Sequence, residues 1–231
     1  MKAKLTTKAK KILSKIVPSS EKLRYLCWLP KLQEFNKIYG SKGAFLESRI
    51  QLYNYLNKTI ENKAISYLEF GVYKGASMRY WAKLNTDENS RFHGFDTFSG
   101  LPESWDNFTG GLEKGTFNTD GKPPEIDDKR VMFYKGLFQD TFPPFMNDYS
   151  SNNTLIINID ADLYSSTLFV LTMAHKILIR DSIIIFDEFS SMLHEFRAFE
   201  DYCNSYNVAF EVIASTRSSK NYYGHVAVRI L

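Results

Sequence analysis

Short apolar runs alternate with segments of helical periodicity from residue 65 to the end of the chain. Near-continuous runs such as residues 155–159 and 183–186 are typical of strands that lie inside a parallel sheet and are covered on both faces. The intervening segments space their apolar residues at helical intervals. The candidate strands are residues 65–70, 91–95, 131–134, 155–159, 182–186, 208–215 and 225–231, and the candidate helices are residues 76–84, 166–179 and 191–206.

The order of these elements predicts the fold class. Strands that alternate with helical crossovers indicate a doubly wound α/β sheet. The last two strands are separated only by the turn region 216–223, so we expect them to pair antiparallel. We therefore predict a Rossmann-like, doubly wound, mostly parallel seven-stranded sheet with an antiparallel C-terminal strand.

Three segments before the sheet have helical patterns: residues 3–17, 21–39 (with Pro30 inside) and 44–62. A chain of 231 residues is short for two ordinary domains. We therefore predict an N-terminal helical extension over residues 1–61 and one sheet domain over residues 62–231. The extension is expected either to cover the site or to form the contact of a homo-oligomer.

The charge of the chain is unevenly distributed. The total is +3, but the first 20 residues hold six lysines and no acid, so the remainder carries −3. This basic terminus fits either contact with an anionic membrane surface or partner, or a solvated end of the chain. The remainder is not basic, which argues against nucleic acid as the main partner. The two cysteines form no cluster and no apolar run approaches bilayer length, so we expect a cytoplasmic location.

The first strand leads into a glycine-containing turn. A dinucleotide fingerprint would need glycine at positions 73 and 76, where this chain has Tyr73 and Ala76. An acid followed by Gly-x-x-x-Gly instead resembles motif I of the class I methyltransferases, which bind S-adenosylmethionine (SAM). The resemblance implies that four residues of this region hold the amino-acid end of SAM: Glu69, Gly71, Gly75 and Ser77.

Two later strand ends extend this candidate cofactor site. Asp96 follows Gly75 by 21 residues and ends the second strand, where a carboxylate can accept both ribose hydroxyls. In related methyltransferases the residues after the third strand flank adenine. By that likeness, Phe138 would pack on the ring and the amide of Gln139 would bond to its polar edge.

Paired acids follow the next two strands: Asp160 and Asp162, then Asp187 and Glu188. We expect all four at the edge of the sheet that carries the cofactor turn. Carboxylates that converge repel one another unless a cation or bound donors neutralise them. Oxygen ligands favour Mg²⁺, which would hold two substrate hydroxyls and lower the pKa of one. Turn capping and solvated strand ends are the alternative explanation.

Several motifs together resemble the macrocin-type (TylF/MycF-like) O-methyltransferase family over about residues 62–190. They are EFGV at residues 69–72, GFDTFSGLPE at 94–103, KGLFQDT at 135–141 and DADLYSST at 160–167. The resemblance implies Mg²⁺ ligation by Asp160, Asp187 and Glu188. These three acids would orient the acceptor, and the resemblance also implies that Asp162 is the candidate general base.

The chain departs from the family pattern at two places. The family has two aspartates after the fifth strand where this chain has Asp187 and Glu188, and the Trp-Arg ending is missing. These departures indicate a divergent branch and leave the metal and the acceptor open. His225 fits either a second base or a hydrogen-bonded strand residue. The irregular segment 99–129, with five glycines and three prolines, is predicted to be a lid or acceptor-binding loop.

We therefore predict a SAM-dependent O-methyltransferase, assisted by Mg²⁺, that acts on a hydroxyl of a sugar or sugar-containing small molecule. Two alternatives belong to other classes. One is a dinucleotide-dependent oxidoreductase, which binding of NADH would indicate. The other is a non-catalytic Rossmann-like binding module, which would not bind SAM.

Overall fold

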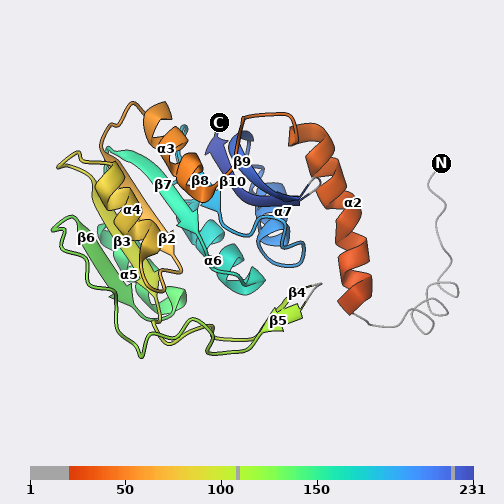
Figure 1. The fold of residues 1–231 in the computed structure, drawn as a ribbon, viewed down its shortest axis with the longest axis horizontal. Helices are drawn as coiled ribbons and strands as arrows, with labels where there is room; N and C mark the ends of the chain where they lie inside the picture. The colour runs from red at the N-terminus through yellow and green to blue at the C-terminus, as the bar shows by residue number, and fades with distance from the viewer. Residues whose placement is uncertain (1–20, 108–109, 220–221) are drawn as a thin grey trace, which may run out of the picture.

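The computed structural model describes residues 21–107, 110–219 and 222–231 (Figure 1). Their main sheet has eight strands in the order β1-β9-β10-β8-β7-β2-β3-β6. The strands are β1 (Ala44–Leu46), β2 (Ile65–Phe70), β3 (Arg91–Asp96), β6 (Val131–Lys135), β7 (Thr154–Ile159), β8 (Ile183–Phe186), β9 (Phe210–Ser219) and β10 (Tyr222–Ile230). The predicted Rossmann-like fold is confirmed, including the antiparallel pairing of β10 with β8 and β9.

Helices cover both faces of this sheet (Figure 1). They are α2 (Glu21–Tyr39), α3 (Arg49–Thr59), α4 (Ala76–Leu84), α5 (Phe138–Asp148), α6 (Tyr164–Ala174) and α7 (Glu195–Tyr206). One buried cluster joins α3 and α4 to the sheet, and a larger one joins α2, α5, α6 and α7 to the opposite face. Neighbouring residues of a strand alternate between the two: Ile156 belongs to the first cluster and Ile157 to the second.

The eighth strand corrects one prediction. Residues 44–62 do not form a single helix, because Ala44–Leu46 is strand β1 and pairs in parallel with β9, with Ala44 opposite Ala214. Gly43 permits this approach: its φ is +73°, and a Cβ there would lie 2.7 Å from the carbonyl carbon of Ile213. The sheet therefore has eight strands rather than the predicted seven.

The helix limits also differ from the prediction at several places. The sequence pattern did not predict α5, which contains Pro143 and Pro144 but buries Phe142 against the sheet. Helix α6 is shorter than residues 166–179, and α7 starts at Glu195 rather than at 191. The 21–39 prediction agrees with α2, in which Pro30 is accommodated.

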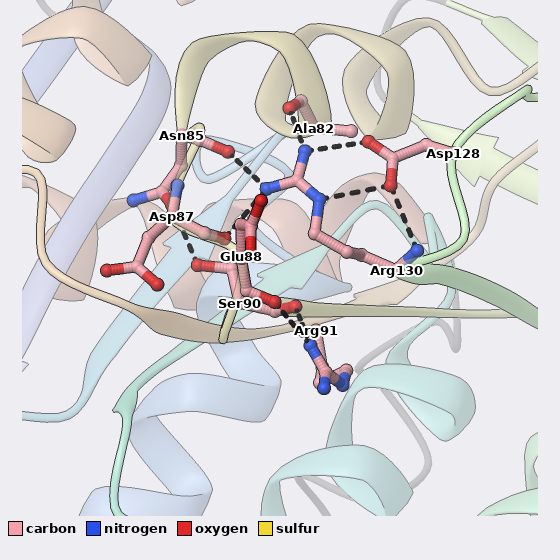
Figure 2. Close-up of polar contacts among 8 residues, drawn as sticks. All are labelled: Ala82, Asn85, Asp87, Glu88, Ser90, Arg91, Asp128 and Arg130. Atoms are coloured by element: carbon pink, nitrogen blue, oxygen red, sulfur yellow. Dashed lines mark hydrogen bonds and ion pairs between the residues drawn. The ribbon is translucent and has the colours of Figure 1, made fainter.

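The C-terminal end of α4 is held by one arginine that precedes β6 (Figure 2). Arg130 donates hydrogen bonds to the carbonyl oxygens of Ala82 at 2.6 Å, Asn85 at 2.7 Å and Asp87 at 2.9 Å. Its guanidinium also pairs with the carboxylate of Asp128. These contacts satisfy carbonyls that a helix end leaves without partners. They fix α4, whose other end begins at the glycine-containing turn.

The predicted helix 3–17 and the basic terminus lie outside the described residues. Among the helices that the structure describes, none has the length and apolar character required to cross a bilayer.

Candidate functional site

A cavity of about 360 Å³ opens at the carboxyl ends of the central strands. Strand β2 lies between β3 and β7, so the order of strands reverses there, and this is where open α/β sheets bind ligands. The lining residues are Gly71, Tyr73, Asp96, Thr97, Gly100, Leu101, Pro102, Glu103, Phe117, Leu137, Phe138, Gln139, Asp160, Ala161, Asp162, Ser165 and Ser166. Six of the predicted site residues are among them.

The turn after β2 is shaped by Gly71 and fastened by Asp96. Gly71 has φ +92°, and a Cβ there would collide with the backbone oxygen of Asp160. One carboxylate oxygen of Asp96 accepts hydrogen bonds from the N–H groups of Val72 and Tyr73, both at 2.8 Å. The other accepts from Phe98 N–H at 2.7 Å. A carboxylate has about four lone-pair sites, so about one remains for a ligand.

Three residues predicted to bind cofactor do not line the cavity. Gly75 is the N-cap of α4, with φ 72°, and its N–H donates to the carbonyl oxygen of Val72 in the turn at 2.8 Å. Ser77 lies in the first turn of α4, where the hydroxyl of Tyr53 donates to its Oγ at 3.2 Å. Glu69 is 1% exposed, and burial raises its pKa well above the usual range. Since none of these three residues lines the cavity, any effect on a ligand there would be indirect.

Asp160 and Asp162 also line the cavity. Asp162 has φ +56°, a left-handed conformation that is strained for a residue with a side chain. Burial, with further contributions from Glu188 and Asp187, raises the pKa of Asp162 to about 7. Burial and the charge of Asp187 also raise the pKa of Asp160. A carboxyl with a pKa near neutrality is suited to accept a proton at physiological pH.

Asp187 lies beside these acids but is hydrogen-bonded to Arg49 and His225. Its Oδ1 accepts from Arg49 at 3.2 Å and from Nε2 of His225 at 2.8 Å. Burial opposes ionisation of Asp187, but the hydrogen bond and charge of His225, together with Arg49, lower its pKa. The other ring nitrogen of His225 lies 2.9 Å from the hydroxyl of Thr216. His225 is thus hydrogen-bonded on both sides, as one of the two sequence interpretations held.

Sequence reasoning missed Arg49 and Thr216. Arg49 is 138 residues from Asp187 and starts α3, and no motif surrounds it. Thr216 lies in β9 opposite the start of β10. Neither residue carries a local signal, because the contact arises only when the edge of the sheet is assembled.

The predicted Mg²⁺ ligands do not fit a metal ion as they are arranged. In the described parts of the chain, no group of three or more histidine, cysteine, aspartate or glutamate side chains is disposed to hold one. The Oδ1 atom of Asp187 already bonds to two nitrogen donors. An Mg²⁺ ion beside Asp187 would have to approach the guanidinium of Arg49, which has the same sign of charge.

The irregular segment 99–129 contributes one wall of the cavity through Leu101, Glu103 and Phe117. Its hairpin, β4 (Trp105–Asn107) and β5 (Gly110–Leu112), reaches toward α2 and α6 (Figure 1). The carbonyl oxygen of Asp106 accepts from Tyr25 at 2.9 Å and lies 2.6 Å from Nε2 of His194. These contacts of Asp106 therefore connect the hairpin of the segment to α2 and to the start of α7.

Comparisons with known proteins agree with this geometry. The profile of a family described as a methyltransferase domain matches residues 68–189. Among the curated proteins, none matches the chain. The O-methyltransferase NovP has a similar structure, with a TM-score of 0.57 and 19% identity, over 78% of this chain and 78% of that one.

Two further solved structures have the same fold. CalS11, a TDP-rhamnose 3'-O-methyltransferase of calicheamicin biosynthesis, gives a TM-score of 0.55 at 16% identity over 98% of this chain and 96% of its own. A structure of cmcI with Mg and SAM gives 0.53 at 14% identity, over 80% of this chain and 72% of its own. At these identities the likeness establishes the fold.

Proposed function

The chain belongs to the family described as a methyltransferase domain, and on that premise we propose that it transfers a methyl group from SAM to a hydroxyl of a sugar or sugar-containing small molecule. The observation that carries the proposal is that Asp96 and Asp162 line the same cavity of about 360 Å³. The sugar is supported by the printed activity of CalS11, which has the same fold.

The residues of the cavity fit SAM. Gly71 leaves room where a side chain would collide, so a ligand can approach the backbone of the turn. The remaining lone pair of Asp96 would accept one ribose hydroxyl, rather than both as the sequence predicted. Phe138 and Gln139 would contact the adenine ring. When bound, SAM supplies an electrophilic methyl group.

The acids of the cavity supply the proton acceptor. A hydroxyl is a weak nucleophile until its proton is removed, and Asp162, with its pKa raised to about 7, can take that proton near neutral pH. Asp160, whose pKa is raised by burial, would orient the acceptor hydroxyl by donating a hydrogen bond in its neutral form. Glu69, Gly75 and Ser77 would act by supporting the turn.

Mg²⁺ assistance through Asp160, Asp187 and Glu188 stays a prediction of the sequence. The Mg in the cmcI structure supports it. The two donors on Asp187 argue against it. The cytoplasmic location and an oligomer formed through the N-terminal segment also stay predictions.

Calorimetric titration with SAM tests the cofactor assignment. We expect the wild type to bind SAM and the Asp96→Ala variant to lose most of its affinity for SAM. Asp127→Ala, which changes an exposed aspartate of the segment 99–129, is the control and should bind SAM like the wild type. Undiminished binding by Asp96→Ala would remove the ribose assignment. A wild type that does not bind SAM would favour the non-catalytic module, and NADH in the same titration would reveal an oxidoreductase.

Mass spectrometry of sugar extracts incubated with enzyme and SAM tests the reaction. The expected product gains the mass of one methylene group, and Asp162→Asn should reduce its formation. Product formed equally by the variant and the wild type would exclude Asp162 as the base.

A further inference from the structure

A chain of polar contacts runs beside the cavity, from the first helix after β1 to the last strand of the sheet. Arg49 of α3 donates to Asp187 at the end of β8, and Asp187 accepts from His225 of β10 on the same oxygen. His225 is held in turn by Thr216 of β9, whose hydroxyl also accepts the backbone N–H of His225 at 2.8 Å. Residues of α3 and β10 thus meet on one carboxylate, and a residue of β9 supports the second of them.

This carboxylate lies at the centre of the acidic residues of the site. Asp187 acts electrostatically on Asp160, Asp162 and Glu188. Arg49 is half-buried and is the cation that acts on Glu69, Asp160 and Asp187 alike. The positive charge that convergent carboxylates require is therefore supplied by the chain itself.

We propose that Arg49 and His225 are positioning residues that hold Asp187 by two hydrogen bonds in the place where the sequence predicted a metal-bound carboxylate, so that methyl transfer by this chain requires no divalent cation. This proposal rests on the proposed function, and it concerns the same site. It follows from the occupied Oδ1 atom of Asp187 and from the lack of a three-ligand group among the described residues.

In this proposal the two acids Asp162 and Asp187 have different roles in the reaction. With no cation to lower the pKa of the acceptor hydroxyl, the proton must pass to a carboxylate of the chain. Asp162 lines the cavity and receives it, whereas Asp187 does not line the cavity and is held by its two donors.

Titration with Mn²⁺, followed by its electron paramagnetic resonance signal, tests this inference without knowledge of the acceptor. We expect no binding by the wild type in the range below millimolar. In the double variant Arg49→Met, His225→Phe, Asp187 loses both donors, and the freed acids should bind Mn²⁺ at least about tenfold more tightly. Lys58→Met, at the other end of α3, is the matched control and should behave like the wild type. Circular dichroism checks that each variant is folded.

Two results would overturn the proposal. One is Mn²⁺ binding by the wild type that Asp187→Asn abolishes, since the acids would then form a metal site beside Arg49. The other is a folded double variant with no gain in Mn²⁺ affinity. Either result leaves the proposed function standing if the wild type binds SAM, whereas a failure to bind SAM would contradict the proposed function without altering the metal titration.

A second measurement separates positioning from a general structural role. Arg49→Lys and His225→Gln each keep a donor for Asp187 and should retain most of the turnover, whereas Arg49→Met and His225→Phe should lower kcat with little change in KM for SAM. Turnover by the wild type should be indifferent to EDTA and to added Mg²⁺. Turnover that EDTA abolishes and Mg²⁺ restores would refute the proposal.

Discussion

Replacing Asp162 by asparagine should stabilise the protein while it removes activity. The pKa of this carboxyl rises from 3.8 to about 7 in the folded protein, mainly through burial. The folded state therefore holds the proton more tightly than the unfolded chain does. The stability that this gives is present below pH 4 and is lost as the pH rises through 7.

The magnitude follows from the shift in pKa. A difference of about three pKa units corresponds to at most about 4 kcal/mol, at 1.36 kcal/mol per unit. Relaxation of the site reduces this bound, and we expect Asp162→Asn to exceed the wild type by about 2 kcal/mol in free energy of unfolding at pH 8. Asparagine keeps the shape of the side chain and tolerates the left-handed φ of +56°.

Urea unfolding between pH 4 and 8 measures this effect. The difference between Asp162→Asn and the wild type should grow from pH 4 to 7 and then level off, while kcat falls by about 10²–10⁴-fold. Asp181→Asn, at an exposed aspartate with φ 70°, is the matched control for the change of residue type. A difference in unfolding free energy that is the same at pH 5 and pH 8 would refute the account of Asp162 as a buried, destabilised base.

Three other changes test separate parts of the structure. Arg130→Met leaves the carbonyls at the end of α4 and Asp128 without their donor, so we expect a loss of about 3 kcal/mol in urea unfolding, against little change for Lys129→Met. Gly71→Ala should abolish SAM binding in calorimetry, because its Cβ would meet backbone; a variant that binds normally would contradict the assignment of the turn. The rate of methyl transfer should rise with pH through about 7 and then level off, since Asp162 must be ionised to accept the proton, and a flat pH–rate profile would count against it.

The central sheet could be predicted from the sequence because its strands carry their own signal. Residues 155–159 and 183–186 are apolar on both faces, and they became β7 and β8 with shifts of about one residue at their ends. The three-residue strand β1 could not be predicted, because the pattern of residues 44–62 suits a helix and its strand pairing depends on the distant β9. Helix α5 could not be predicted because its two prolines give the segment a low helix propensity. In the folded protein the packing of Phe142 outweighs that propensity.

Some residues of the candidate site could likewise be predicted from the sequence and others could not. Gly71, Asp96 and Asp160 could be predicted because each ends or follows a strand whose position the apolar pattern reveals. The partners of Asp187 could not, since Arg49 comes from outside the alternating pattern. The tertiary structure also shows that Asp96 uses most of its capacity to fasten the turn, which spacing alone does not indicate.

The position of β10 bears on how the protein is made. Strand β10 lies between β8 and β9, so β9 and β1 can join the main sheet only after β10 has been synthesised. Arg49 and His225, from early and late in synthesis, meet at the same carboxylate only at that stage. A chain shortened before β10 would therefore lack the strand that connects β9 and β1 to the sheet, and it would lack the His225 donor of Asp187.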